Sequence, residues 1–175
     1  MRNFVILMLS FILFTACNDK KDEKIRYTQK SDEINTLKDL LKNYEEADWD
    51  TYKTHFADTA KLYYNSRDAI DVETAMATHE ENNAALSSYE FPDDKDEFEM
   101  VVTDDDETWV NYWGDWQGTI AENDSTVHIP VHITARFVDG KIVAEHVYFD
   151  NSGISKALSD LEEARTKDQD SLNQE

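Results

Sequence analysis

The spacing of apolar residues near the start of the chain predicts two helices. Between Ile34 and Tyr44, apolar side chains recur every three or four positions, which is the period of a helix with one buried face. Asp48 is a helix-capping residue type, and it precedes a second, shorter apolar pattern made by Trp49, Tyr52 and Phe56. This part of the chain therefore predicts one amphipathic helix and one short capped helix.

A third helix is expected after a brief strand over residues 60–65. It begins at Asp68 or Asp71 and carries an apolar face that includes His79. A histidine in that position either hydrogen-bonds within the core or faces a ligand. Residues 87–94, which include Pro92, break the helical pattern.

The second half of the chain is rich in strand patterns. Strands are predicted over residues 97–102, 108–120, 126–138 and 141–150, with a last amphipathic helix from about Ser152. Helices followed by a long antiparallel meander indicate an α+β fold. Gly114 and Gly118 suit a sheet that bends sharply. The predicted architecture is a cone, in which a curved antiparallel sheet wraps around three N-terminal helices and is followed by a C-terminal helix.

The closing hairpin sets which side chains face the interior of this cone. Asp139-Gly140 is a strong signal for a two-residue turn, which pairs Val138 with Lys141. Extending that register without interruption puts three polar groups on the aliphatic face of the hairpin: His146, Tyr148 and Asp150. If Ile120 pairs with Val127, the same face also carries Tyr112 and Trp116.

An imidazole and a carboxylate in an apolar cavity can act as general base and general acid near neutral pH. Asp150 and His146 are therefore the expected catalytic pair. The expected ligand-binding residues are Tyr148, His79, Trp116, Tyr112, Trp49 and Tyr52. The alternative is that Asp150 lies at the open rim and caps the following helix, with Tyr148 filling the core.

The first seventeen residues resemble a bacterial lipoprotein signal. A positive Arg2 precedes an apolar run that is short for a membrane span, and small residues lead to Cys17, the only cysteine. The resemblance implies cleavage before Cys17 and acylation of that residue, which would anchor the protein to a lipid membrane of the bacterial cell envelope. The predicted organisation is a signal peptide (1–16), a disordered tether (17–31), one domain (32–160) and an acidic, partly helical tail (161–175).

Charge and composition exclude several partners and cofactors. Loss of Arg2 with the signal peptide changes the formal net charge from −21 to −22, which argues against binding nucleic acid phosphates. A single cysteine used as an anchor leaves none for disulfides or thiolate metal sites. His128 and His132 lie about 13 Å apart on a strand, too far to share one ion. No cofactor and no metal are expected.

Two stretches resemble the SnoaL-like proteins of the nuclear transport factor 2-like superfamily. They are "EEADWDTYKTHFADTAKLYYN" (45–65) and "ARFVDGKIVAEHVYFD" (135–150). The resemblance spans about residues 32–160 and implies an α+β cone with a pocket, often paired into dimers through the sheet. It also makes Asp150 an acid/base candidate. Tyr63-Tyr64-Asn65 stands where ketosteroid isomerases carry their general base, which argues against that activity.

Two functions remain open from the sequence. In the first, the domain binds a small, largely apolar molecule in its cone, with any catalysis of the isomerase, cyclase or dehydratase type and without a metal. In the second, the domain is a non-catalytic interaction or dimerisation module that uses the outer sheet face, with contacts from Pro130, Val143, Val147 and Phe149. An open cavity of about 300 Å³ or more favours the first function. A cavity filled by Trp116, Tyr112 and Met76 favours the second.

Overall fold

The computed structural model describes residues 25–92 and 96–172. Its helices are α2 (Asp32–Glu45), α3 (Trp49–Tyr52), the 3-10 helix η2 (Lys53–His55), α4 (Val72–Asn83) and α5 (Ser152–Leu172). Its strands are β1 (Tyr27–Thr28), β2 (Phe56–Tyr64), β3 (Leu86–Glu90), β4 (Glu97–Val102), β5 (Thr108–Ile120), β6 (Thr126–Val138) and β7 (Lys141–Phe149). The α+β fold class predicted from the sequence is confirmed. The predicted signal peptide and Cys17 lie outside the described residues.

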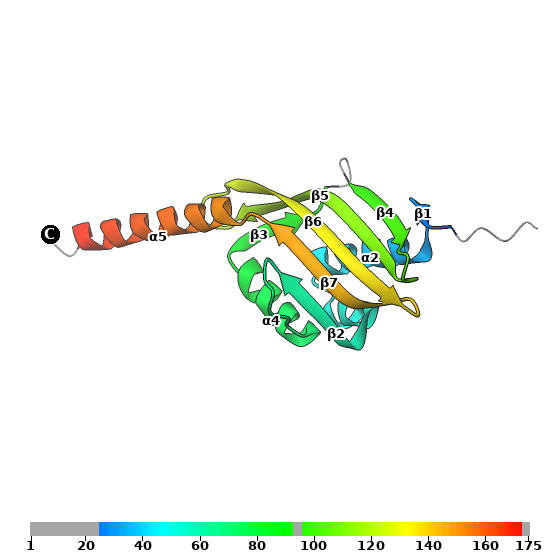
Figure 1. The fold of residues 1–175 in the computed structure, drawn as a ribbon. Helices are drawn as coiled ribbons and strands as arrows, with labels where there is room; N and C mark the ends of the chain where they lie inside the picture. Colours follow the sequence, from blue (N-terminus) through cyan, green and yellow to red (C-terminus); the bar gives the residue numbers. More distant parts are fainter. Residues whose placement is uncertain (1–24, 93–95, 173–175) are drawn as a thin grey trace, which may run out of the picture.

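The strands form one curled sheet that does not close into a barrel (Figure 1). Its order is β1-β4-β5-β6-β7-β2, and β3 pairs with the far end of β5. All pairings are antiparallel except that of β2 with β7. Because β5 and β6 are 13 residues each, they form the long curved centre of the sheet.

Each of the three N-terminal helices begins at a capping residue, and the sequence predicts the caps of the second and third. Ser31 accepts a hydrogen bond from the backbone N–H of Ile34, and Asp48 accepts one from Thr51. Asp71, and not Asp68, caps α4 by accepting from Thr74. These caps satisfy backbone donors that have no partner within the first turn of a helix.

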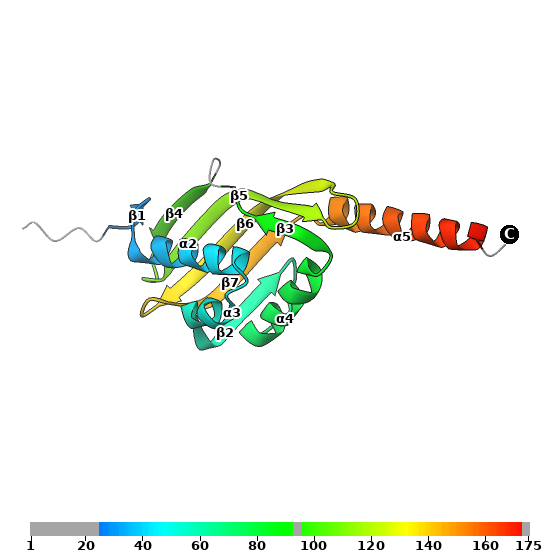
Figure 2. The same cartoon turned by 180° about the vertical axis from the view of Figure 1, so that it is seen from behind.

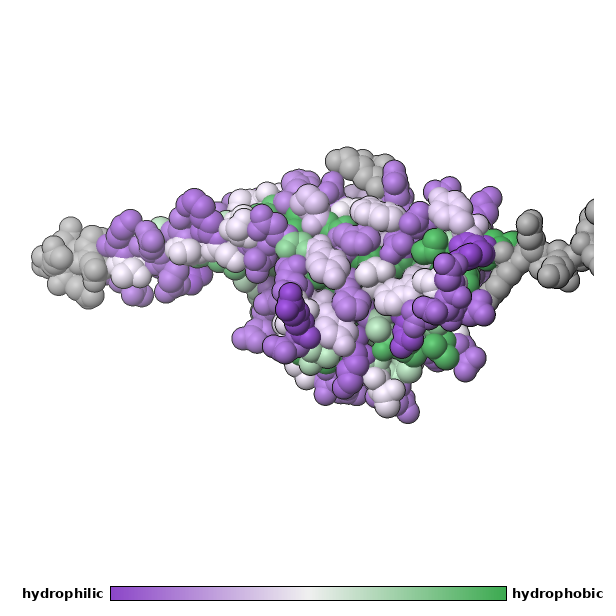
Figure 3. Space-filling view, in the orientation of Figure 1, coloured by the Kyte–Doolittle hydropathy of each residue, from purple (hydrophilic) through white to green (hydrophobic). Residues whose placement is uncertain are grey.

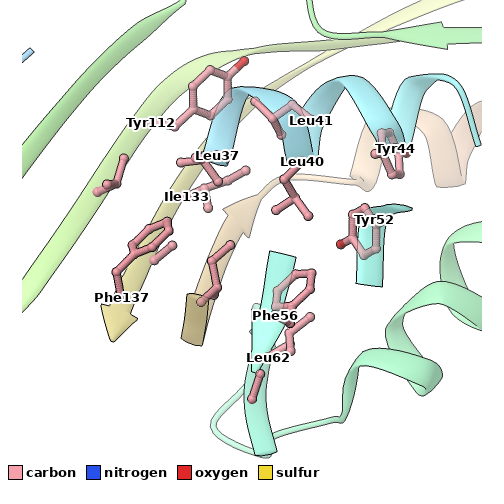
Figure 4. Close-up of a cluster of buried hydrophobic side chains, with 14 of the residues drawn as sticks. Leu37, Leu40, Leu41, Tyr44, Tyr52, Phe56, Leu62, Tyr112, Ile133 and Phe137 are labelled. Carbon is pink, nitrogen blue, oxygen red and sulfur yellow. The ribbon is translucent and has the colours of Figure 1, made fainter. Parts of the chain in front are cut away.

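The helices cover the concave face of the sheet and close the core. Figure 2 shows α2 and α3 in front of the strands, with α4 beside β2. The buried stripe of α2 packs against inward side chains of β5 and β6, among them Tyr112, Ile133 and Phe137 (Figure 4). Leu37 and Leu40 of α2 are 0% and 2% exposed, so this helix is the main cover of the sheet.

The register between β6 and β7 differs from the prediction by one residue. Val138 pairs with Lys141 and Phe137 with Ile142, as predicted, but Arg136 then pairs with Ala144. The extra residue, Val143, makes a β-bulge. Because side chains alternate between the two faces, one extra residue exchanges the faces of everything that follows it in β7.

The register between β5 and β6 also differs, but with no effect on the faces. Thr119 pairs with Thr126, whereas the prediction paired Ile120 with Val127. The shift is two residues, one full period of a strand, so Tyr112 and Trp116 still face the interior. A Cβ added at Gly118 would overlap the indole of Trp116, so this glycine gives the Trp116 ring room to lie along β5.

Two segments differ from the sequence prediction. Tyr27 and Thr28, placed in the disordered tether, pair with Val101 and Met100 as the edge strand β1. Part of the predicted break at 87–94 is strand β3. The last helix continues through the acidic tail to Leu172, which agrees with the predicted helical character of that tail, and it projects away from the sheet (Figure 1). Within the described ranges, no helix is both long and apolar enough to cross a membrane.

Candidate functional site

A cavity of about 300 Å³ lies between the concave face of the sheet and the helices. Its wall is mainly aliphatic and aromatic. The aliphatic part comes from Leu40, Leu41, Leu86, Ile129, Val131, Ile133, Val147, Ile154 and Leu158. The aromatic part comes from Tyr44, Tyr52, Tyr64, Phe91, Trp116 and Phe149. A space of this size holds about ten water molecules or a small organic ligand.

Glu145 is the one buried acidic side chain of the described residues, and it faces this cavity. It pairs with Ala135 on the inner face because the bulge at Val143 turns it inward. The side chain is 2% exposed, and burial raises the pKa of its carboxyl from 4.5 to about 7. The hydrogen bond from Tyr64 opposes this rise only in part. Glu145 is therefore a carboxyl group that gains and loses its proton near neutral pH.

Tyr64 connects Glu145 to His79. Its hydroxyl lies 3.4 Å from Glu145 Oε2, to which it donates, and 3.1 Å from His79 Nε2. Burial raises the pKa of Tyr64 well above 10 and lowers the pKa of His79 to about 4. Both groups are therefore neutral at pH 7. The three side chains come from β7, β2 and α4, and they form a continuous row of polar contacts.

A second hydrogen-bonded row lies in the same wall, where the ring of Tyr44 contacts His79 at 5.0 Å between centroids. Trp116 Nε1 donates to the hydroxyl of Tyr44 over 3.2 Å, and that hydroxyl donates to Asn83 Oδ1 over 3.3 Å. Burial raises the pKa of Tyr44 to about 12. Asn83 Nδ2 is buried without a hydrogen-bond partner among the described residues. This row fixes the orientation of the indole that forms part of the cavity wall.

The predicted catalytic residues lie outside the cavity. His146 pairs with Thr134 and stacks on Tyr63 at 4.4 Å between ring centroids, on the outer face of the sheet. Tyr148 is 51% exposed on that face. The prediction that these residues face the interior is wrong, because it assumed a β7 ladder without a bulge.

Asp150 is exposed and follows the end of β7. Its carboxylate accepts a hydrogen bond from the backbone N–H of Ser152 over 2.9 Å, and that contact lowers the pKa of Asp150 below its usual value. Asp150 is not among the residues that line the cavity, although its neighbours Phe149 and Asn151 are. Its contact with Ser152 at the start of α5 agrees with the alternative, in which Asp150 lies at the open rim beside the last helix. A capping carboxylate at a helix start stays ionised and faces water.

The other predicted ligand-binding residues divide into two groups. His79, Trp116 and Tyr52 line the cavity. Trp49 stacks on His79 at 6.1 Å between ring centroids and therefore supports the wall from behind. Tyr112 is fully buried and donates to Asp96 Oδ1 over 2.7 Å, away from the cavity wall.

Sequence reasoning missed Glu145, Tyr64 and Asn83. Glu145 was visible as the acidic residue five positions after Gly140, but the unbulged register placed it on the outer face. Tyr64 lies in the stretch that was noted only for lacking a carboxylate base. Asn83 ends α4, and the helical period places it on the same face as His79, but no role in the site was predicted for it.

No group of three or more His, Cys, Asp or Glu side chains that could hold a metal ion occurs within residues 25–92 and 96–172. His132 instead lies 2.9 Å from the backbone oxygen of Tyr112 through Nδ1 and stacks on Trp113. The chemical capacity of the site is therefore that of Glu145, Tyr64 and His79. These groups can bind, donate a proton or accept one in an apolar surrounding.

The architecture is an open cone of helices and curled sheet with a cavity at its centre. The fold is similar to those of solved structures described as SnoaL-like and NTF2-like proteins. No family model and no curated protein matches the sequence. The similarity thus lies in the fold.

Three solved structures illustrate this similarity. A putative SnoaL-like polyketide cyclase from Shewanella denitrificans is 15% identical over 75% of this chain and 99% of that chain, with a TM-score of 0.58. IdmH, a putative polyketide cyclase from Streptomyces antibioticus, is 17% identical over 73% of this chain and 98% of its own, with a TM-score of 0.57. A hypothetical protein of ketosteroid isomerase-like fold from Catenulispora acidiphila, in complex with trimethylamine, is 12% identical over 65% of this chain and 83% of that chain, with a TM-score of 0.51.

Proposed function

We propose that this domain binds a small, largely apolar molecule in its cone. The observation that carries the proposal is the cavity of about 300 Å³, which has an apolar wall and a single ionisable group that titrates near neutral pH. Trp116 lines this space but does not fill it, and Tyr112 and Met76 are not part of its wall. These features favour ligand binding over an interaction module with a filled pocket.

Any chemistry in this site would be acid/base work by Glu145, with Tyr64 and His79 as its proton relay. With its carboxyl pKa near 7, Glu145 exists in both protonation states under ordinary conditions. The 3.1 Å and 3.4 Å contacts of Tyr64 support transfer of a proton between Glu145 and His79. This assignment replaces Asp150 and His146, which do not reach the cavity.

Binding of tert-butylbenzene, a neutral apolar probe, tests the proposed function. We expect saturation-transfer NMR to detect its binding to the wild-type protein at pH 7. Val147→Phe should weaken that binding at least tenfold, because the larger ring enters the cavity. Val101→Phe is the matched control, since Val101 lies on β4 away from the cavity wall. Wild-type protein that does not bind the probe would contradict the proposal.

Attachment to a bacterial membrane is a second part of the proposal. It rests on the short apolar run that ends in Thr15-Ala16-Cys17. In a bacterial host, the full chain should sediment with membranes, and Cys17→Ser should move it to the soluble fraction. A Cys17→Ser protein that stays with the membranes to the same extent as the wild type would exclude acylated Cys17 as the anchor.

Pairing of two copies through the outer sheet face is also proposed. Trp113 and Tyr148, which are 42% and 51% exposed, stack on the two sides of His132 on that face. Val147 and Phe149 are cavity residues and cannot supply the contact expected from them. Figure 3 shows this face with hydrophilic and intermediate residues and scattered hydrophobic ones. Sedimentation velocity that shows a monomer at every concentration would exclude the dimer.

A further inference from the structure

Glu145 has no counter-ion among the residues that the structure describes. None of the described residues forms an ion pair with it, and its one hydrogen bond is the 3.4 Å contact from Tyr64. A carboxylate offers about four acceptor positions, so most of its capacity is unused. Because an ionised carboxylate without a partner is unfavourable in an apolar site, a bound cation would stabilise it.

The cavity wall carries no positive charge. Its described residues include neither lysine nor arginine, and the neutral imidazole of His79 is the nearest basic group. An anionic ligand would therefore meet only Glu145 and find no partner. The formal net charge of −21 also repels anions and raises the local concentration of cations.

The aromatic part of the wall suits a positively charged nitrogen. Tyr44, Tyr52 and Tyr64 line the cavity together with Trp116 and Phe149. The face of an aromatic ring carries partial negative charge and attracts ammonium groups, most strongly where water is excluded. Aromatic rings beside a single carboxylate thus provide both interactions that hold an organic cation.

We propose that the ligand of this cone has an apolar body with a positively charged nitrogen, either a protonated amine or a quaternary ammonium, placed against Glu145. This inference rests on the proposed function, because it assigns the chemical class of ligand for the same cavity. The competing ligand is a neutral molecule with a carbonyl group, which would accept a hydrogen bond from protonated Glu145.

The charge preference should depend on pH through Glu145 alone. The other titratable groups that face its carboxyl are Tyr52 from α3, Tyr64 from β2 and His79 from α4. Burial raises the pKa of both phenols well above 10 and lowers the pKa of His79 to about 4, so none of these three changes charge between pH 5.5 and pH 8.

Two probes of the same shape test the inference: phenyltrimethylammonium and tert-butylbenzene. Saturation-transfer NMR with the wild-type protein should show the cation binding about tenfold tighter than the hydrocarbon at pH 8. At pH 5.5, where Glu145 is protonated, this preference should fall to about twofold or less. Glu145→Gln should reduce the preference to about twofold or less at both pH values, and Glu80→Gln, on the exposed side of α4, should behave as the wild type.

The outcomes separate this inference from the proposed function. Hydrocarbon binding without a preference for the cation at pH 8 would overturn the inference and leave the proposed function standing. A tenfold preference that Glu145→Gln retains would also overturn it, because the cation would then be held elsewhere. Binding of neither probe would overturn the proposed function and the inference together. Circular dichroism of each variant checks that it is folded.

Discussion

Glu145→Gln should be more stable than the wild type above pH 7 by about 3 kcal/mol. The pKa of this carboxyl is about 7 in the folded protein and near 4.5 in the unfolded chain. Below pH 4.5 the carboxyl is neutral in both states, and its stabilising contribution is fully present. Between pH 4.5 and pH 7 the unfolded chain ionises first, so that contribution is lost as the pH rises. The neutral glutamine avoids this loss because it has no proton to release.

Urea unfolding followed by tryptophan fluorescence measures the effect. The difference in free energy of unfolding between Glu145→Gln and the wild type should grow by about 2 to 3 kcal/mol from pH 5 to pH 8. Glu80→Gln removes one exposed carboxyl from α4, so its stability should follow the wild-type curve. A difference that stays constant with pH would show that Glu145 ionises in the folded protein as it does in water.

Leu37→Ala should lower the free energy of unfolding by about 3 kcal/mol. Leu37 lies on the buried stripe of α2 and is 0% exposed. Figure 4 shows it beside Ile133 and Tyr112, where the helix covers the centre of the sheet. Removing a buried leucine loses the transfer energy of its side chain and leaves a cavity, which together destabilise a protein by roughly 2–5 kcal/mol.

Leu158→Ala provides a matched control for this substitution. Leu158 is 36% exposed on α5, at the cavity mouth, so the same change should cost less than about 1 kcal/mol. Unfolding in urea at pH 7 compares the two variants directly. Equal losses for Leu37→Ala and Leu158→Ala would mean that α2 is no better packed than α5.

Local patterns in the sequence were sufficient to predict most of the helices and strands. The α2 stripe, the caps at Asp48 and Asp71 and the Asp139-Gly140 turn each act over a few residues, so their effect can be read without knowing the rest of the chain. The face of Tyr112 and Trp116 was also predictable, since an error of two residues in register leaves a side chain on the same face. The positions of His79, Tyr52 and Trp116 in the cavity wall follow from these patterns.

The residues that supply the chemistry of the site could not be predicted from local sequence patterns. Val143 is an ordinary strand residue, and nothing local marks it as the extra residue of a bulge. The assignment of His146, Tyr148 and Asp150 to the interior depended on a regular ladder, so that single residue was enough to overturn it. A glutamate such as Glu145 is also expected on the surface, because burying an unpaired carboxyl group is energetically unfavourable.

The sequence by itself therefore determined the fold class, the helix that covers the sheet and the apolar character of the cone. Only the tertiary structure decided that Glu145 faces inward and that Tyr64 and His79 meet it. The physical reason lies in the range of the interactions. Helix periods, caps and turns are set by neighbours in the chain, whereas the face of a strand after a bulge is set by its pairing with β6 and β2, which the whole curved sheet determines.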